Sequence, residues 1–246
     1  MEILKHDDPL VISFVRAVQT GNLDALRRLL NEIPGLASKR AIDRKGGTRT
    51  TLHVVTDWPG YFPNGPMIAK MLMDAGADPN AKATGGTFSE TPLHWAASSD
   101  DAEVAAVLID CGADIEVLGG SIAGGTPLDN AVGYGCWNVA RLLVQRGARV
   151  DKLWHAAALG MMSLVEELMT TNPAPTVRDM TEAFWQACHG GQRRVAEYLL
   201  SYGADINGMP DYTDQTPLDA ARSLDTRRDT LSSWLESKGG KSSRQS

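Results

Sequence analysis

An internal repeat is the feature that most constrains this sequence. The pattern Thr-Pro-Leu-x-x-Ala begins at Thr91, Thr126 and Thr216, and a weaker copy begins at Thr50. A Gly-Ala pair follows at a fixed distance, 21 residues after both Thr91 and Thr126. Two patterns that keep one spacing indicate a repeated structural unit. A unit this short cannot bury its apolar face alone, so neighbouring units must stack to form a core.

Each part of the repeat has a physical role in a helix–turn–helix unit. Threonine is a favoured helix N-cap, and proline is tolerated in the first helical turn because its missing N–H would have no helical partner there. The alanines let neighbouring helices approach closely. Leu108, Leu143 and Leu199 each lie four residues before a Gly-Ala pair and supply the buried stripe of a second helix. The glycine permits the left-handed turn that ends this helix.

These patterns resemble the ankyrin repeat family, whose ~33-residue unit carries the T-P-L-H-x-A signature and folds as a β-turn plus two helices. The resemblance covers residues 9 to about 238. It implies a bacterial-type, all-α ankyrin-repeat solenoid of about six to seven stacked helix-turn-helix units with short β-turn fingers. We expect one domain at 1–238. Its parts are a cap at 9–43, units from about 44, 81, 117, 151 and 177, a closing unit at 208–238, and then a disordered tail at 239–246.

Composition and charge exclude several classes of protein. The net charge of -6 and the lack of a long basic run disfavour nucleic-acid binding. The acidic N-terminus is unlike a signal peptide, and the aliphatic runs are far shorter than the ~20 residues of a membrane span. The 3 cysteines are widely spaced and form no CxxC pair, which indicates reduced thiols and no zinc site. We therefore expect a cytoplasmic protein that is a monomer.

Departures from the regular spacing single out one region. The distance from Thr50 to Gly76 is 26 residues, so five extra residues lie between the two helices of this repeat, within HVVTDWPGYFPNGP at 53–66. If this insertion points outward, Trp58 only covers an edge of the core. If it points inward, Asp57 and Trp58 form one wall of a site. The sequence leaves this direction open.

The connections between repeats also differ in length. Gly76 to Thr91 is 15 residues and Gly112 to Thr126 is 14, whereas Gly147 to Asp151 is only 4. The two long connections contain the glycine-rich fingers AKATGGTFSE and VLGGSIAGG, and glycine allows tight turns with positive φ. Long fingers beside a missing one predict a notch in the binding face.

The resemblance also indicates which residues face a ligand. In the ankyrin family the first helix of each pair lines the concave face, with exposed positions directly after T-P-L-H and three and four residues further on. The i, i+3, i+4 spacing places such residues on one helix face. The resulting ligand- or partner-binding residues are Asp57, Trp58, Trp95, Ser98, Asn130, Tyr134, His155, Gln186 and His189. The motif histidines His53 and His94 instead have the family's structural role, a hydrogen bond between neighbouring turns.

Two functions fit this pattern. The array covers nearly the whole chain, which favours a non-catalytic module that binds a still unidentified protein partner on its concave face and finger tips. The alternative is a small-molecule binder or an unusual enzyme, because aromatic walls with a few polar groups are typical of both interface hot spots and ligand pockets. An enzyme would use His155, His189 and Asp57. No P-loop, dinucleotide or metal-ligand spacing is present, so we expect no cofactor and no metal.

Overall fold

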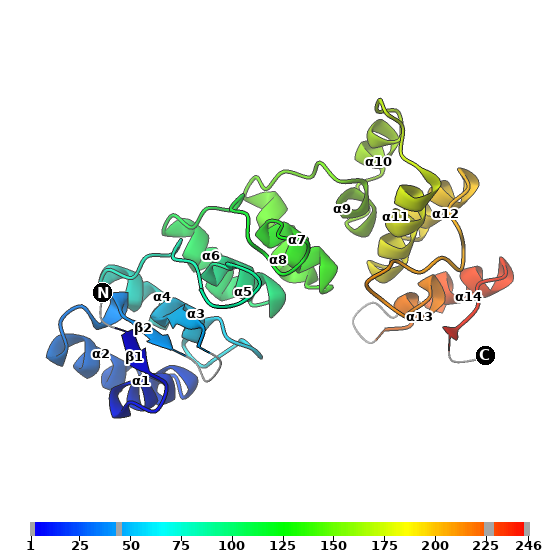
Figure 1. Ribbon diagram of the computed structural model, residues 1–246. Coiled ribbons are helices and arrows are strands. Elements are labelled where there is room, and N and C mark those ends of the chain that lie inside the picture. The colour runs from blue at the N-terminus through cyan, green and yellow to red at the C-terminus, as the bar shows by residue number, and fades with distance from the viewer. Residues whose placement is uncertain (1–2, 43–45, 224–228, 244–246) are drawn as a thin grey trace. The chain divides into compact units, whose positions relative to one another are not determined.

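The structure, a computed structural model, describes residues 3–42, 46–223 and 229–243 of the 246-residue chain. It divides into two compact parts, the N-terminal unit Met1–Ala148 and the C-terminal unit Arg149–Ser246. Both are built mainly from short helices, as the sequence predicts (Figure 1). The division falls within 147–151, the connection that is too short to hold a finger.

The N-terminal unit contains two rows of stacked helices. The first helices of the repeats form one row and contact each other in chain order, and the second helices form the other row. The first row is α1 (Pro9–Gln19), α3 (Thr51–Val55), α5 (Pro92–Ser98) and α7 (Pro127–Gly133). The second row is α2 (Leu23–Glu32), α4 (Gly65–Asp74), α6 (Ala102–Asp110) and α8 (Trp137–Gln145). Leu108 and Leu143, which the sequence predicts in the buried stripe of the second helices, are fully buried.

A small sheet lies at the N-terminal end of this unit. It has the order β1 (Ile3–Lys5), β2 (Arg40–Ile42), β3 (Thr48–Thr50), with β1 and β2 parallel and β2 and β3 antiparallel. Ile3 is aligned with Arg40, and Arg40 with Thr50. A 3-10 turn at Leu36–Ser38 precedes β2. The repeat spacing did not predict these strands, because they lie outside its two helices.

Threonines start the helices as the repeat predicts. Thr91 forms a capping box with His94, and Thr126 forms one with Asp129. The histidine does more than the aspartate: its Nδ1 accepts from the Thr91 amide at 3.2 Å, and its Nε2 lies 3.1 Å from the Gly125 carbonyl of the next finger. In the same way, Nε2 of His53 lies 3.1 Å from the Glu90 carbonyl oxygen. Both histidines therefore have the structural role expected from the family resemblance.

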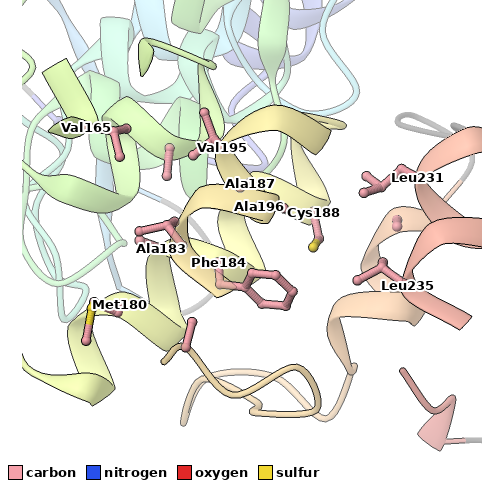
Figure 2. Close-up of a cluster of buried hydrophobic side chains, with 14 of the residues drawn as sticks. Val165, Met180, Ala183, Phe184, Ala187, Cys188, Val195, Ala196, Leu231 and Leu235 are labelled. Atoms are coloured by element: carbon pink, nitrogen blue, oxygen red, sulfur yellow. The ribbon is translucent and has the colours of Figure 1, made fainter. Parts of the chain in front are cut away.

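The C-terminal unit is organised around one long helix. Figure 2 shows Phe184, Ala187 and Cys188 of α11 in its apolar core. The helices are α9 (Leu153–Ala158), α10 (Met162–Leu168), α11 (Val177–His189), α12 (Arg193–Ser201), α13 (Pro217–Ala221) and α14 (Asp229–Ser237). The helix α11 begins at Val177, because Thr176 forms its capping box with Asp179.

The residues after α14 return to this unit. The Ser242 hydroxyl donates to Asp219 at 2.6 Å and the Ser243 amide donates to the same carboxylate at 2.9 Å. Burial raises the pKa of Asp219, but these hydrogen bonds outweigh it and hold the pKa well below its usual range. Residues 239–243 thus differ from the disordered tail expected from 239 onward, because polar groups of the closing repeat bind them. Residues 244–246 lie outside the described residues.

Candidate binding pocket in the N-terminal unit

The insertion between α3 and α4 is tethered to the repeats on both sides. The Tyr61 amide donates to the Asp101 carboxylate at 2.9 Å, and the Asn64 side chain donates to the Gly21 carbonyl at 2.9 Å. Gly21 has a φ of +66° and packs closely against Pro63. A Cβ atom added to Gly21 would lie only 2.4 Å from the carbonyl oxygen of Pro63. The insertion is therefore held in one place, and the helices on either side of it keep their positions in the two rows.

The direction of the insertion is inward. Asp57 and Trp58 line a pocket of about 260 Å³ together with residues of the next two repeats. The other lining residues are Thr56, Glu90, Trp95, Ser98, Ser99, Ser121 and Tyr134. Five residues that the sequence placed on the binding face, all of them in the N-terminal unit, thus surround one hollow.

Two helices of the first row position walls of the pocket. Trp95 and Ser98 belong to α5, and Tyr134 follows the end of α7. The ring of Trp95 lies edge-to-face on His53, with centroids 4.8 Å apart, so the buried motif histidine also positions a wall of the pocket. Trp58 is 80% exposed and Tyr134 is 50% exposed, which leaves two aromatic side chains at the surface beside the hollow.

Glu90 is the main polar group that the repeat pattern did not reveal. Its Oε1 accepts hydrogen bonds from the Ser121 amide at 2.9 Å and from the Asn130 side chain at 2.8 Å. Glu90 lies in a finger, directly before the Thr91-Pro92 helix start, and the binding stripe was drawn only from helices. The sequence did contain a signal for Glu90: it is an acidic residue directly before an N-cap threonine. A residue at that position lies where the finger meets the first helix.

The second carboxylate of the pocket is already paired. Asp57 Oδ2 lies 2.6 Å from Arg49, and Asp57 Oδ1 accepts from the Trp58 amide at 3.0 Å. The ion pair places Asp57 at the edge of the pocket and limits its use as a base. Glu90 has no ion pair with any of the residues that the structure describes.

Three of the predicted binding residues are buried, which corrects their assignment to an exposed stripe. Asn130, His155 and Gln186 are at most 1% exposed. The physical reason is that neighbouring segments fold over the first stripe position: the Ile122 amide of a finger donates to Asn130, and Tyr212 bonds Gln186 at 3.0 Å. Asn130 therefore supports the pocket by holding Glu90 and Ser98. The positions four residues later, such as Trp58 and Tyr134, are the exposed ones.

The two candidate catalytic histidines belong to the C-terminal unit. The His155 ring packs on Trp154 with centroids 4.0 Å apart, and the half-buried His189 ring lies 5.0 Å from that of Trp185. Neither lines the pocket of the N-terminal unit. A separate hollow of about 480 Å³ in the C-terminal unit includes Glu182, whose pKa is raised by burial, and the ion pair of Arg178 with Asp211.

No group of three or more His, Cys, Asp or Glu among the described residues is arranged to hold a metal ion. Within the same residues, no helix has the length and apolar character needed to cross a membrane.

Comparisons with known proteins agree with this architecture. The family model described as "Ankyrin repeats (3 copies)" matches residues 61–152. Among solved structures, the human ASB11 ankyrin repeat domain has a TM-score of 0.52 and 20% identity, and the match covers 93% of this chain and 98% of that one. A likeness at this identity shows the fold.

Curated relatives match over shorter shares of their own length. The mouse "B-cell lymphoma 3 protein homolog" is 28% identical over 88% of this chain and 48% of its own. A "Putative ankyrin repeat protein" of Rickettsia felis is 29% identical over 61% and 58%, and chicken "NF-kappa-B inhibitor alpha" is 30% identical over 50% and 32%. The chain thus spans about half the length of the curated relatives it matches. The repeat, the two rows of paired helices and these matches together show an all-α ankyrin-repeat fold, with ankyrin repeats identified over residues 61–152.

Proposed function

We propose that this protein is a non-catalytic binding module and that it contacts a partner protein through the pocket face of its N-terminal unit and the adjacent finger tips. The observation that supports this most directly is the pair of exposed aromatic side chains, Trp58 and Tyr134, beside a hollow walled by Trp95. Tryptophan and tyrosine are enriched among the residues that contribute most to protein–protein binding.

The tethers of the insertion favour a binding role over a purely structural cover. A structural cover would bury Trp58, whereas its ring is mostly in water. The bonds of Tyr61 to Asp101 and of Asn64 to Gly21 fix the backbone that carries it. A binding loop that is already ordered loses less conformational entropy on association, which strengthens binding without any added contact.

The relatives are consistent with a protein as the bound species. One of them is named as an inhibitor of NF-kappa-B, which is a statement about that protein only. The chain spans about a third of the length of that relative.

A capture experiment with matched variants tests the proposal. The full chain would be crosslinked in extracts of its native host, in parallel with Trp95→Ala, Tyr134→Ala and the control Tyr202→Ala, which removes an exposed tyrosine of the C-terminal unit. We expect a protein that binds the wild type and the control and is lost with either pocket variant. Binding that survives both pocket variants would refute the proposed face.

Several sequence predictions remain predictions. They are the single repeat domain at 1–238, the notch beside the missing finger, partner contacts by the half-buried His189, the cytoplasmic location and the monomeric state. The alternative function, a small-molecule site or an enzyme using Asp57, His155 and His189, also remains a prediction. Asp57 is bound to Arg49, and the two histidines belong to the other unit.

A further inference from the structure

Three hydroxyl groups of the pocket donate their hydrogens to backbone carbonyls. Thr56 Oγ1 donates to the Leu52 carbonyl at 3.2 Å, Ser98 Oγ donates to the His94 carbonyl at 3.0 Å, and Ser99 Oγ donates to the Trp95 carbonyl at 3.1 Å. A hydroxyl has one hydrogen and two lone pairs. Once the hydrogen is used within the protein, such a group can offer a ligand only an acceptor.

Other groups of the lining add acceptors. The Tyr134 hydroxyl donates to Ser121 Oγ at 3.2 Å, and the carboxylates of Asp57 and Glu90 are acceptors when ionised. Among the described residues that line the pocket, none is lysine, arginine or histidine. The pocket therefore combines an excess of acceptors with a negative charge, and a complementary ligand must carry donors and a positive charge.

Glu90 is oriented for such a ligand. Both of its hydrogen bonds, from Ser121 and Asn130, end on Oε1. None of the described residues donates a hydrogen bond to Oε2 of Glu90. Two donors thus fix the carboxylate while one of its oxygens stays available, so it can bind a cation without first losing side-chain freedom.

We propose that this pocket binds an arginine side chain of the partner protein, with the guanidinium paired to Glu90 and stacked against the indole walls of Trp58 and Trp95. This inference rests on the proposed function, since it names the chemistry of the group that the partner would insert. A guanidinium has five N–H donors and no acceptor, pairs with carboxylates in a fork geometry and stacks on aromatic faces. Cations over tryptophan rings are stabilised by the ring quadrupole.

The size of the pocket agrees with a single side chain. A volume of about 260 Å³ lies below the ~300 to 1,000 Å³ of typical small-molecule sites. Arginine is favoured over lysine because several acceptors surround the space: the Glu90 carboxylate and the hydroxyl oxygens of Ser98 and Ser99. An ammonium carries three donors on one point charge and has no planar face to lie against an indole.

Titration of the full ¹⁵N-labelled chain with small peptides tests this proposal directly. The probe is acetyl-Gly-Arg-Gly-amide, and the comparison probes replace arginine by citrulline, which keeps the shape without the charge, and by lysine. We expect saturable shifts of the Trp58 and Trp95 indole N–H signals with the arginine peptide, and at least tenfold weaker binding of both comparison peptides.

Two variants complete the test. Glu90→Gln keeps an oxygen that can accept from Ser121 and Asn130, so the pocket keeps its shape and loses its charge. We expect arginine-peptide binding to weaken at least tenfold in this variant and to be unchanged in Glu103→Gln, which removes an exposed acid from α6.

The outcomes separate this inference from the proposed function. Absence of indole shifts, equal binding of the citrulline or lysine peptide, or unchanged binding in Glu90→Gln would each overturn the arginine assignment. If the captured partner is nevertheless lost with Trp95→Ala, the proposed binding face stands and only the arginine assignment fails. If the peptide binds as expected but no captured partner depends on Trp95 or Tyr134, the proposed function fails.

Discussion

Acidification should destabilise the N-terminal unit through His53. Burial lowers the pKa of this imidazole from 6.5 to about 4, and the nearby positive charges of Arg40 and Arg49 act in the same direction. The ring is fully buried, and its two nitrogens hold Thr50 and the Glu90 carbonyl. A proton on Nδ1 would remove the acceptor that the Thr50 amide and hydroxyl use.

The sign and size of the effect follow from proton linkage. Because the folded pKa is below the unfolded one, the unfolded state binds more protons between pH 6.5 and 4, so the stability contribution is fully present above pH 6.5 and is lost as the pH falls. With pKa values of about 4 and 6.5, the free energy of unfolding should drop by about 2.4 kcal/mol between pH 7 and pH 4.5. Burial lowers the pKa of His94 as well, so this residue adds to the loss.

The variant His53→Asp isolates this contribution. It keeps a capping box of the kind that Thr126 forms with Asp129, but it has no group that titrates between pH 7 and pH 4.5. Urea unfolding followed by circular dichroism should show a less stable variant at pH 7, because the bond to the Glu90 carbonyl is gone. This stability gap should narrow by about 2 kcal/mol at pH 4.5. Parallel pH profiles for the two proteins would refute the reasoning.

Three further predictions concern stability and reactivity. Gly21→Ala should lower the free energy of unfolding by about 1 to 3 kcal/mol more than Gly35→Ala, because both have positive φ but only at Gly21 would a Cβ meet neighbouring atoms; equal losses in urea unfolding would contradict this. Asp101→Ala should lose about 1 to 2 kcal/mol, since Asp101 caps α6 and tethers the insertion, and a smaller loss in thermal unfolding would argue against the tether. In the native protein a thiol reagent should modify Cys111 first, because the other two cysteines are buried; rapid modification of all three would contradict the packing.

The sequence predicted the parts of the fold whose signals are local. Threonine caps, the buried leucines and the Gly-Ala turns lie within a few residues of the structure they specify, so the repeats could be placed by spacing alone. The strands β1 and β2 depend on pairing between residues 3–5 and 40–42. Nothing in either segment by itself indicates that pairing.

The candidate site was predicted in part for the same reason. Asp57, Trp58, Trp95 and Tyr134 are found together because their repeat positions determine their places on the stacked helices. Glu90 and Ser121 come from fingers, whose conformation depends on contacts with the next repeat. Asn130 was expected at the surface because helix periodicity says which face a residue is on but not what folds over that face.

The tethers of the insertion also bear on how such a chain can be recombined. Whole repeats of an array can be exchanged when each contacts only its immediate neighbours through standard surfaces. Here the inserted loop takes one anchor from Gly21 in the preceding segment and another from Asp101 in the following repeat. A graft of its own repeat alone would leave both anchors behind. The smallest transferable cassette that keeps both anchors of the insertion is therefore three consecutive segments, and a cassette that also keeps Ser121 and Tyr134 of the pocket needs the following repeat as well.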